Sequence, residues 1–321
     1  MRAMRLLTVT VLAAFLVLFV SASCSQGVQV HATSTEYYVV VEYGSGELSR
    51  VAPDGTVTLI ASGLSGPLQV AIDGSGNYIV TEDNANRLSR VTPGGTITTI
   101  VGGLNGPNGI AIDSSGNYIV AESSSGNLLR ITPGGTISTI ASGFVHPAGV
   151  AIDGSGNYIV SDQNANELYR VTPSGTKTLI TGTGLTGPQD VAVDGSGNYI
   201  VIESNSELSK VTPAGVVTLI TNNVHSGPGV AIDCSGDYVV TEQSINQLSR
   251  VTPGGTVTLI ASGLSRPTSV AVVCQPAVTG QPIGGFMEPV NKLALAAPYL
   301  ALFGIMAVVV ATVVPWKRRG N

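Results

Sequence analysis

The chain has 321 residues, of which 43% are hydrophobic and 11% charged, together with 40 glycines and 17 prolines. This composition is too apolar for a disordered chain and too rich in turn-forming residues for a helical bundle. Three cysteines are too few for a disulfide-rich scaffold. Five of the 15 basic residues lie at the two ends, whereas all 20 acidic residues lie between them, so the middle has a formal charge of −10. That excess of negative charge argues against nucleic-acid binding.

Residues 1–23 are typical of a secretory signal peptide. Two arginines precede the uncharged apolar run Leu6–Val20, and small residues follow it up to Cys24. This order predicts cleavage near Cys24. An uncleaved anchor is one alternative. Lipid modification of Cys24 is another, although Ser21 occupies the position where lipoprotein signals usually carry leucine.

After a short linker, 24–35, the sequence repeats one unit six times over residues 36–274. A proline recurs with a period of 40 at Pro53, Pro93, Pro133, Pro173, Pro213 and Pro253. The second unit has β-type runs at Val70–Asp73, Tyr78–Glu82 and Leu88–Thr92, separated by Gly-rich and Pro-Gly turns, and a fourth run like Thr56–Ile60 ends each unit. Four short strands per 40 residues are typical of a propeller blade. We therefore expect an all-β, six-bladed β-propeller of four-stranded blades.

The two ends of the array complement each other. The first unit begins in its second strand, Tyr37–Glu42, and the chain after Pro267 supplies only a first strand, Val270–Val273. Together they would complete the sixth blade and close the ring. Cys234 and Cys274 occupy the same position in neighbouring blades, so they form either a disulfide at the closure, in an oxidising compartment, or two free thiols if their backbones lie too far apart.

A linker, 275–292, leads to a predicted transmembrane helix. Leu293–Val314 is a run of 22 residues without a charge, which is long enough to span a hydrocarbon core of about 30 Å. Trp316 would lie at the interface, and the basic tail 315–321 would stay in the cytoplasm. The propeller would then lie outside the cell. The segment Glu288–Leu295 with its basic tail resembles C-terminal anchors of archaeal surface proteins.

The repeat resembles two related propeller families. Pro107–Asp113 and Gly116–Glu122 resemble the NHL repeat, in which a Pro-x-Gly-Ile-Ala-Val-Asp run precedes a Gly-Asn turn and a second strand. Thr81-Glu82, Asn86 and Arg90–Gly95 are similar to the Thr-Glu, Asn and Arg-Ile-Thr-Pro-x-Gly pattern of the streptogramin (virginiamycin B) lyase family. The resemblance implies the fold, whereas activity varies among propellers that share it.

Two acidic positions recur in the blades. The first ends the first strand, where a carboxylate would cap the following turn: Asp73, Asp113, Asp153, Asp194 and Asp233. The second ends the second strand: Glu42, Glu82, Glu122, Asp162, Glu203 and Glu242. This second set would either bind Ca²⁺ or Mg²⁺ as a ring at the propeller axis or pair with a repeated cation. The six matching cations favour pairing: Arg50, Arg90, Arg130, Arg170, Lys210 and Arg250.

Sequence differences between blades cluster in the loop after the second strand and in the Gly-Pro loop, which emerge on the same face. His146 and His225 lie in Gly-Pro loops and are either ligand-binding or ordinary loop residues. The predicted inner strands, Val70–Asp73 and its copies, carry no charged residue that is specific to one blade. This regularity favours a binding or display module over an enzyme.

The family resemblance also allows a test of catalysis. A lyase of this family would carry its catalytic histidine directly after the loop proline, but these positions hold Leu68, Asn108, Ala148, Gln189, Pro228 and Thr268. The lyase acid–base group is therefore missing. Similarity to gluconolactonase-like propellers would instead imply a divalent cation held by Asn and Asp side chains with a Glu. Asn108 fits that pattern and Gln189-Asp190 fits it in part, which is fewer than the ligands a hard cation needs.

These observations predict a monomeric, single-pass cell-surface protein without a catalytic residue. It would bind an extracellular protein, glycan or small molecule through its loop-rich face. The ligand-binding candidates are Asn108, Gln189, Glu82, Glu122, Asp162, Glu203, Glu242, His146 and His225. The alternatives are a metal-dependent lyase or lactonase that uses Asn108, Gln189, Glu122 and Glu203, and a structural member of a surface layer.

Overall fold

The computed structural model describes residues 35–275, and these form an all-β ring. The predicted signal peptide, Cys24, the membrane segment 293–314 and the basic tail lie outside the described residues. Residues 35–275 contain no helix with the length and apolar character needed to cross a membrane. One 3₁₀ turn, η1 (Gln243–Ile245), interrupts the strands.

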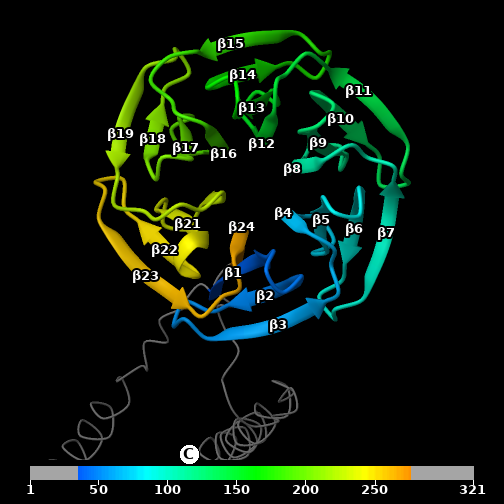
Figure 1. Cartoon of the computed structure of the whole chain (residues 1–321), viewed down its shortest axis with the longest axis vertical. Coiled ribbons are helices and arrows are strands. Elements are labelled where there is room, and N and C mark those ends of the chain that lie inside the picture. The colour runs from blue at the N-terminus through cyan, green and yellow to red at the C-terminus, as the bar shows by residue number, and fades with distance from the viewer. Residues whose placement is uncertain (1–34, 276–321) are drawn as a thin grey trace, which may run out of the picture. The chain divides into compact units, whose positions relative to one another are not determined.

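Six four-stranded antiparallel sheets surround a central axis, which confirms the predicted six-bladed propeller (Figure 1). Blade 1 consists, from the axis outward, of β24 (Pro267–Gln275), β1 (Thr35–Glu42), β2 (Glu47–Val51) and β3 (Val57–Ser62). Blade 2 consists of β4 (Pro67–Ile72), β5 (Tyr78–Glu82), β6 (Arg87–Val91) and β7 (Ile97–Gly102). Blade 3 consists of β8 (Pro107–Ile112), β9 (Tyr118–Glu122), β10 (Asn127–Ile131) and β11 (Ile137–Ala141). Blade 4 consists of β12 (Pro147–Ile152), β13 (Tyr158–Asp162), β14 (Glu167–Val171) and β15 (Lys177–Thr181). Blade 5 consists of β16 (Pro188–Val193), β17 (Tyr199–Glu203), β18 (Leu208–Val211) and β19 (Val217–Thr221). Blade 6 consists of β20 (Val230–Ile232), β21 (Tyr238–Glu242), β22 (Gln247–Val251) and β23 (Val257–Ser262).

The ring closes where the sequence predicts. β24 pairs with β1 in antiparallel register from Thr35↔Gln275 to Glu42↔Pro267, so one blade is built from both ends of the described chain. A disulfide joins Cys234, in the first turn of blade 6, to Cys274 of β24, with the two Cα atoms 5.7 Å apart. The closure therefore combines a strand pairing with a covalent link between blades 6 and 1.

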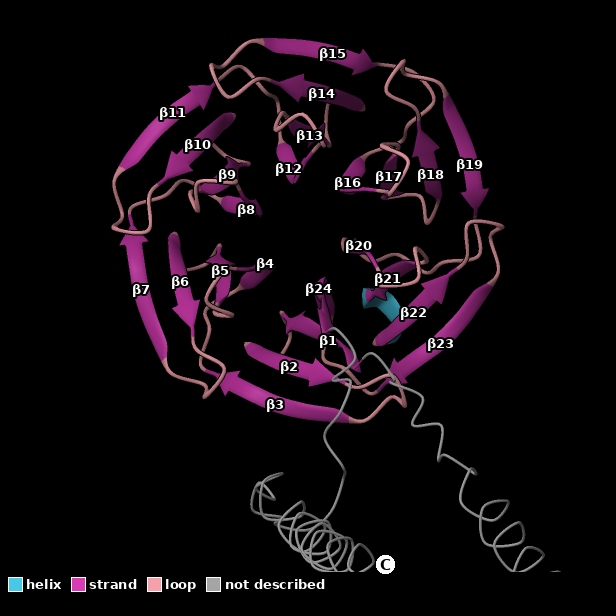
Figure 2. Ribbon diagram, turned by 180° about the vertical axis from the view of Figure 1, so that it is seen from behind, coloured by secondary structure: helices cyan, strands magenta, loops and turns pink. Residues whose placement is uncertain are grey.

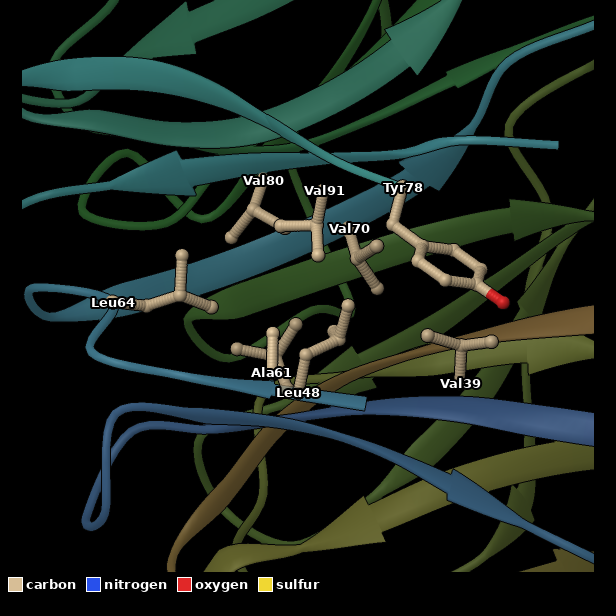
Figure 3. Close-up of a cluster of buried hydrophobic side chains, with 9 residues drawn as sticks. Val39, Leu48, Ala61, Leu64, Val70, Tyr78, Val80 and Val91 are labelled. Carbon is tan, nitrogen blue, oxygen red and sulfur yellow. The ribbon is translucent and has the colours of Figure 1, made fainter. Parts of the chain in front are cut away.

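The hydrophobic core lies in the seams between blades. Val39 and Leu48 of blade 1 pack against Val70, Tyr78 and Val80 of blade 2 (Figure 3). The second strands of blades 2 to 6 are buried along their whole length because a neighbouring blade covers each of their faces. The outer strands run along the rim, as Figure 2 shows from behind, and are partly exposed. The blades thus stabilise one another sideways.

The first repeated aspartate caps its turn, as predicted. In blade 2, Oδ1 of Asp73 accepts hydrogen bonds from the backbone N–H groups of Ser75 and Asn77, each at 2.9 Å. Gly76 has a φ of 79°, a left-handed conformation that glycine adopts without strain. These turns form the face of the ring opposite the Gly-Pro loops.

The repeated cation joins neighbouring blades, and its predicted pairing with the second-strand Glu is wrong. Nη2 of Arg90 in β6 donates to the hydroxyl of Tyr118 in the next blade at 2.9 Å. Its Nε lies 3.9 Å from Asp73 of its own blade. Arg130 and Arg170 make the same two contacts in their seams. These arginines lie at the turn end of the strands, whereas the second-strand Glu lies at the loop end, so the two charges are too far apart to pair.

Candidate functional site

The six Gly-Pro loops converge on a pocket at the propeller axis. Its volume is about 80 Å³, and it is lined by Leu68, Gln69, Asn108, Ala148, Gln163, Gln189, Pro228 and Thr268. Six of these residues occupy equivalent positions, one in each blade. Five directly follow the loop proline, and in blade 6, whose loop is one residue shorter, the proline Pro228 itself takes this position. These are the positions at which a lyase of the family would carry its catalytic histidine. They meet around one pocket, and each blade contributes a different residue to it.

The pocket lining is uncharged and rich in amides. Asn108 and Gln189, two predicted ligand-binding residues, lie in it together with Gln69, Gln163 and the hydroxyl of Thr268. Oε1 of Gln189 is buried and has no hydrogen-bond partner among the described residues. An unpaired buried acceptor costs free energy unless a ligand or water satisfies it. The pocket is thus suited to a group that donates hydrogen bonds.

A buried carboxylate lies directly beneath this lining. Asp190 in β16 is 7% exposed, and its Oδ1 accepts from its neighbour's N–H, that of Val191, at 2.9 Å. Its Oδ2 accepts from the N–H of Val230 in blade 6 at 3.1 Å. Burial raises the pKa of Asp190 to about 7, although these two bonds and one from the side chain of Gln69 favour the ionised form. Gln69 belongs to blade 2, across the axis, so it connects the pocket lining to this carboxylate.

Asp190 was not among the predicted site residues, and the prediction that the inner strands carry no blade-specific charge is wrong. The observed inner strand of blade 5 begins at Pro188, three residues earlier than predicted, and therefore includes Asp190. The signal in the sequence is the comparison of copies: the same position holds Gln69, Gly109, Gly149, Gly229 and Ser269 in the other blades. Glycine is required next to it, because a Cβ on Gly149 would lie 2.5 Å from Oδ1 of Asp190.

The second-strand acids do not form a ring at the axis. Each is buried at the loop end of its blade, where most accept a backbone N–H from the adjacent Gly-Pro loop. Glu82 accepts the N–H of Ser65 at 2.7 Å and binds the guanidinium of Arg87 through both oxygens at 2.7 Å. Glu122 accepts from the N–H of Asn105 at 2.8 Å. These residues therefore anchor the loops that form the pocket.

The remaining loop acids follow the same plan with one exception. Asp162 accepts two consecutive backbone N–H groups, those of Val145 at 2.8 Å and His146 at 2.7 Å. Glu242 instead lies 3.2 Å from Nδ1 of His225, a side chain that is 59% exposed. Neither histidine lines the axial pocket. Both candidates thus belong to the loop framework in this structure.

The residues do not fit the shared cation site of the lactonase alternative. Asn108 and Gln189 lie in the pocket, but Glu122 is bound to Asn105 and Ser125, and Glu203 accepts the backbone N–H of its own loop at Thr186. Within residues 35–275, no three His, Cys, Asp or Glu side chains are placed to hold a metal ion. A hard cation needs about six or more oxygen ligands, which this arrangement does not bring together.

Comparisons with known proteins identify the fold. No family model matches the chain, and no curated protein matches it. Among solved structures, a streptogramin B lyase shares 15% identity with a TM-score of 0.58, covering 73% of this chain and 91% of that one. Virginiamycin B lyase from Staphylococcus aureus shares 18% identity with a TM-score of 0.57, covering 76% and 93%. A chain in a nidogen/laminin complex shares 15% identity with a TM-score of 0.66, covering 77% and 100%.

These likenesses confirm, at the level of the fold, the predicted resemblance to the streptogramin lyase and NHL propellers. One is named as an enzyme and the other comes from a complex between proteins. The shared fold is therefore compatible with catalysis and with binding, and the site itself has to distinguish them.

Proposed function

We propose that this protein is a membrane-anchored extracellular binding module that receives its partner through the loop-rich face, with the axial pocket at the centre of the contact. The observation that carries the proposal is the pocket lining. Six equivalent positions, one from each blade, hold six different residues, whereas the second strands beside them are nearly the same in every blade. Differences that converge on one concave, amide-lined surface are characteristic of a recognition site.

The size of the pocket favours a macromolecular partner. Pockets for small molecules usually measure about 300–1,000 Å³. A volume of about 80 Å³ accommodates one protruding side chain rather than a complete small-molecule substrate. The likeness to a chain from a nidogen/laminin complex supports an extracellular protein as the class of partner. The absence of histidine from the six positions, and the internal bonding of Glu122, weaken the enzymatic alternatives.

The proposed location outside the membrane draws on the sequence and on one structural feature. The signal sequence 1–23 and the apolar run 293–314 predict export and anchoring. The disulfide between Cys234 and Cys274 supports an oxidising compartment. Protease treatment of intact cells that express the full chain tests this placement. We expect the propeller to be cleaved from outside, and protection until the membrane is broken would contradict it.

The binding face is tested with two bulky substitutions in blade 3. Asn108→Trp fills the axial pocket, whereas Ser115→Trp adds the same group to an exposed turn on the opposite face. Peptides selected from a displayed library on the wild-type protein should bind Asn108→Trp at least tenfold more weakly and Ser115→Trp equally well. The proposal would be refuted if the selected peptides bound Asn108→Trp as tightly as the wild type, or if the library yielded no saturable binder.

A further inference from the structure

Asp190 is a buried carboxylate without a cationic partner among the described residues. None of the ion pairs within residues 35–275 includes it, and its oxygens accept only neutral N–H groups. Burying an unpaired carboxylate costs several kcal/mol. The bond that Asp190 accepts from Val230 needs only a neutral acceptor, because Gln69 and Ser269 at the equivalent positions accept the N–H of the next blade in the same way. The other three blades hold glycine there. A buried carboxylate at a position where a neutral acceptor is sufficient points to a functional role.

The pocket above Asp190 presents acceptors and no charge. The unpaired Oε1 of Gln189 lies in the same lining as the amides of Asn108 and Gln163 and the hydroxyl of Thr268. Asp190 directly follows the lining residue Gln189 in β16, and Gln69, which also lines the pocket, favours its ionised form, so the carboxylate lies next to the pocket wall. A negative charge next to a pocket within the protein attracts a cation more strongly than the same charge does in bulk water.

The surrounding face adds to the negative potential. The acidic side chains in or beside its loops are Glu42, Glu47, Glu82, Asp83, Glu122, Asp162, Glu167, Glu203, Glu207 and Glu242. Among the described residues of these loops the basic side chains are Arg87, Arg266, His146 and His225. Arg87 is already paired with Glu82, and His225 lies beside Glu242. A cleft of one sign of charge concentrates counter-ions and steers them to the site.

We propose that the axial pocket receives a cationic side-chain tip from the partner, a lysine ammonium or an arginine guanidinium, with Asp190 as its counter-charge. This inference rests on the proposed function and names the chemistry of the group that the pocket accepts. An ammonium has three N–H donors, which match the amide and hydroxyl oxygens of the lining. A pocket of about 80 Å³ has room for such a tip and its last methylene groups.

A divalent metal ion is a poorer occupant than an organic cation. The pocket supplies one carboxylate, behind its wall, and no three His, Cys, Asp or Glu side chains of residues 35–275 are placed to hold a metal. Ca²⁺ takes about six to eight oxygen ligands, usually including several carboxylates. An organic cation needs only a few acceptors and one counter-charge.

The experiment uses the full-length protein in detergent and two probes, Nα-acetyl-lysine methylamide and its Nε-acetylated form, with binding followed by ligand-observed NMR. The acetylated probe keeps the shape of the chain but loses the positive charge. Asp190→Asn removes the buried charge, whereas Asp83→Asn removes one charge from the same face outside the pocket lining. We expect the lysine probe to bind the wild type and Asp83→Asn within twofold of each other, and Asp190→Asn at least tenfold more weakly.

Three results would overturn the inference: equal binding of both probes, equal binding to Asp190→Asn and the wild type, or no saturable binding of the lysine probe. Thermal unfolding of Asp190→Asn at pH 8 shows whether a loss of binding reflects unfolding. Asn108→Trp separates the two proposals. If it abolishes binding of a selected peptide that contains no lysine or arginine, the loop-rich face is a binding surface and only the cation inference fails. If it leaves peptide binding intact, the proposed function fails.

Discussion

Blades 2 and 5 lie across the axis from each other and share one backbone plan, but their electrostatics are opposite (Figure 1). In blade 2, burial disfavours the charged form of Glu82, but bonds from Arg87 and Ser89 outweigh it and lower the pKa of Glu82. In blade 5, burial raises the pKa of Glu203, and Glu207, at the position equivalent to Arg87, raises it further. The acid at the end of the second strand is therefore paired with an arginine in blade 2, whereas in blade 5 it faces a second acid, Glu207.

The axial position repeats this difference. Blade 2 places the neutral Gln69 there, whereas blade 5 places Asp190. Both side chains accept a backbone N–H from the inner strand of the next blade, that of Ile110 or Val230, so the position does not require a charge. Proteins tolerate such locally unfavourable groups mainly where function needs them. The unpaired acids of blade 5 therefore support the binding role proposed above, whereas in blade 2 the equivalent groups are neutral or paired.

Asp190→Asn should give blade 5 a neutral amide at the axis, as blade 2 has with Gln69, and should therefore remove a pH dependence of the free energy of unfolding. The pKa of Asp190 in the folded protein is about 7, above its ordinary value of 3.8, so the folded state keeps a proton that the unfolded chain releases. Its contribution to stability is therefore full below about pH 4, falls as the pH rises towards 7, and is constant above that. The wild type should lose up to about 4 kcal/mol relative to Asp190→Asn across this range. Urea unfolding of both proteins from pH 4 to pH 8 measures this difference in the free energy of unfolding. Parallel pH profiles of the two proteins would contradict the prediction.

Gly149→Ala tests how tightly the carboxylate of blade 5 is packed. The added Cβ would lie 2.5 Å from Oδ1 and 2.6 Å from Cα of Asp190, so β12 and β16 would have to separate. We expect a destabilisation of about 1–3 kcal/mol, as for other overpacked interiors. Gly154→Ala is the control, because its Cβ would meet no atom within 4 Å. Equal stability of the two variants in chemical denaturation would show that the axis is loosely packed.

Exchanging the partners of the two glutamates should move stability in opposite directions. Arg87→Glu places a second acid beside the buried Glu82 and should destabilise the protein by about 1–2 kcal/mol, a value reduced by the partial exposure of Arg87. Glu207→Arg gives blade 5 the arrangement of blade 2 and should stabilise by up to about 1 kcal/mol. Both effects should shrink at high salt. Changes of the same sign would mean that the two blades do not share this local geometry.

Divalent cations should have the smallest effect on either blade. Because Glu122 and Glu203 are bonded within their own loops, we expect the same thermal unfolding curve in EDTA as with Ca²⁺ or Mg²⁺. A bound ion at 100 times its dissociation constant would stabilise by about 2.7 kcal/mol. A saturable shift of that size would revive the metal-dependent lyase or lactonase and justify substrate screens.

Much of the architecture follows from the sequence because a propeller blade is built from short-range rules. The 40-residue period, the Asp-capped turns and the Pro-Gly turns each act within a few residues, so they predict four strands per unit. The incomplete units at Tyr37 and Val270 predict the closure, since unpaired strands of matching type have one place to pair. The repeat also aligns Leu68, Asn108 and Gln189, which is why the residues that meet in the pocket were identifiable before their positions in space.

Only the tertiary structure decided which partner each charge has. Arg90 binds Tyr118 of the next blade, and Asp190 meets Val230 of blade 6 and Gln69 across the axis. The partners of Glu82 likewise include a backbone N–H of the preceding Gly-Pro loop. Local patterns determine the shape of a blade, but the neighbours of a charge depend on how blades far apart in sequence are brought together when the ring closes. The sequence therefore determined the blades and their number, whereas packing between blades determined the electrostatics of the site.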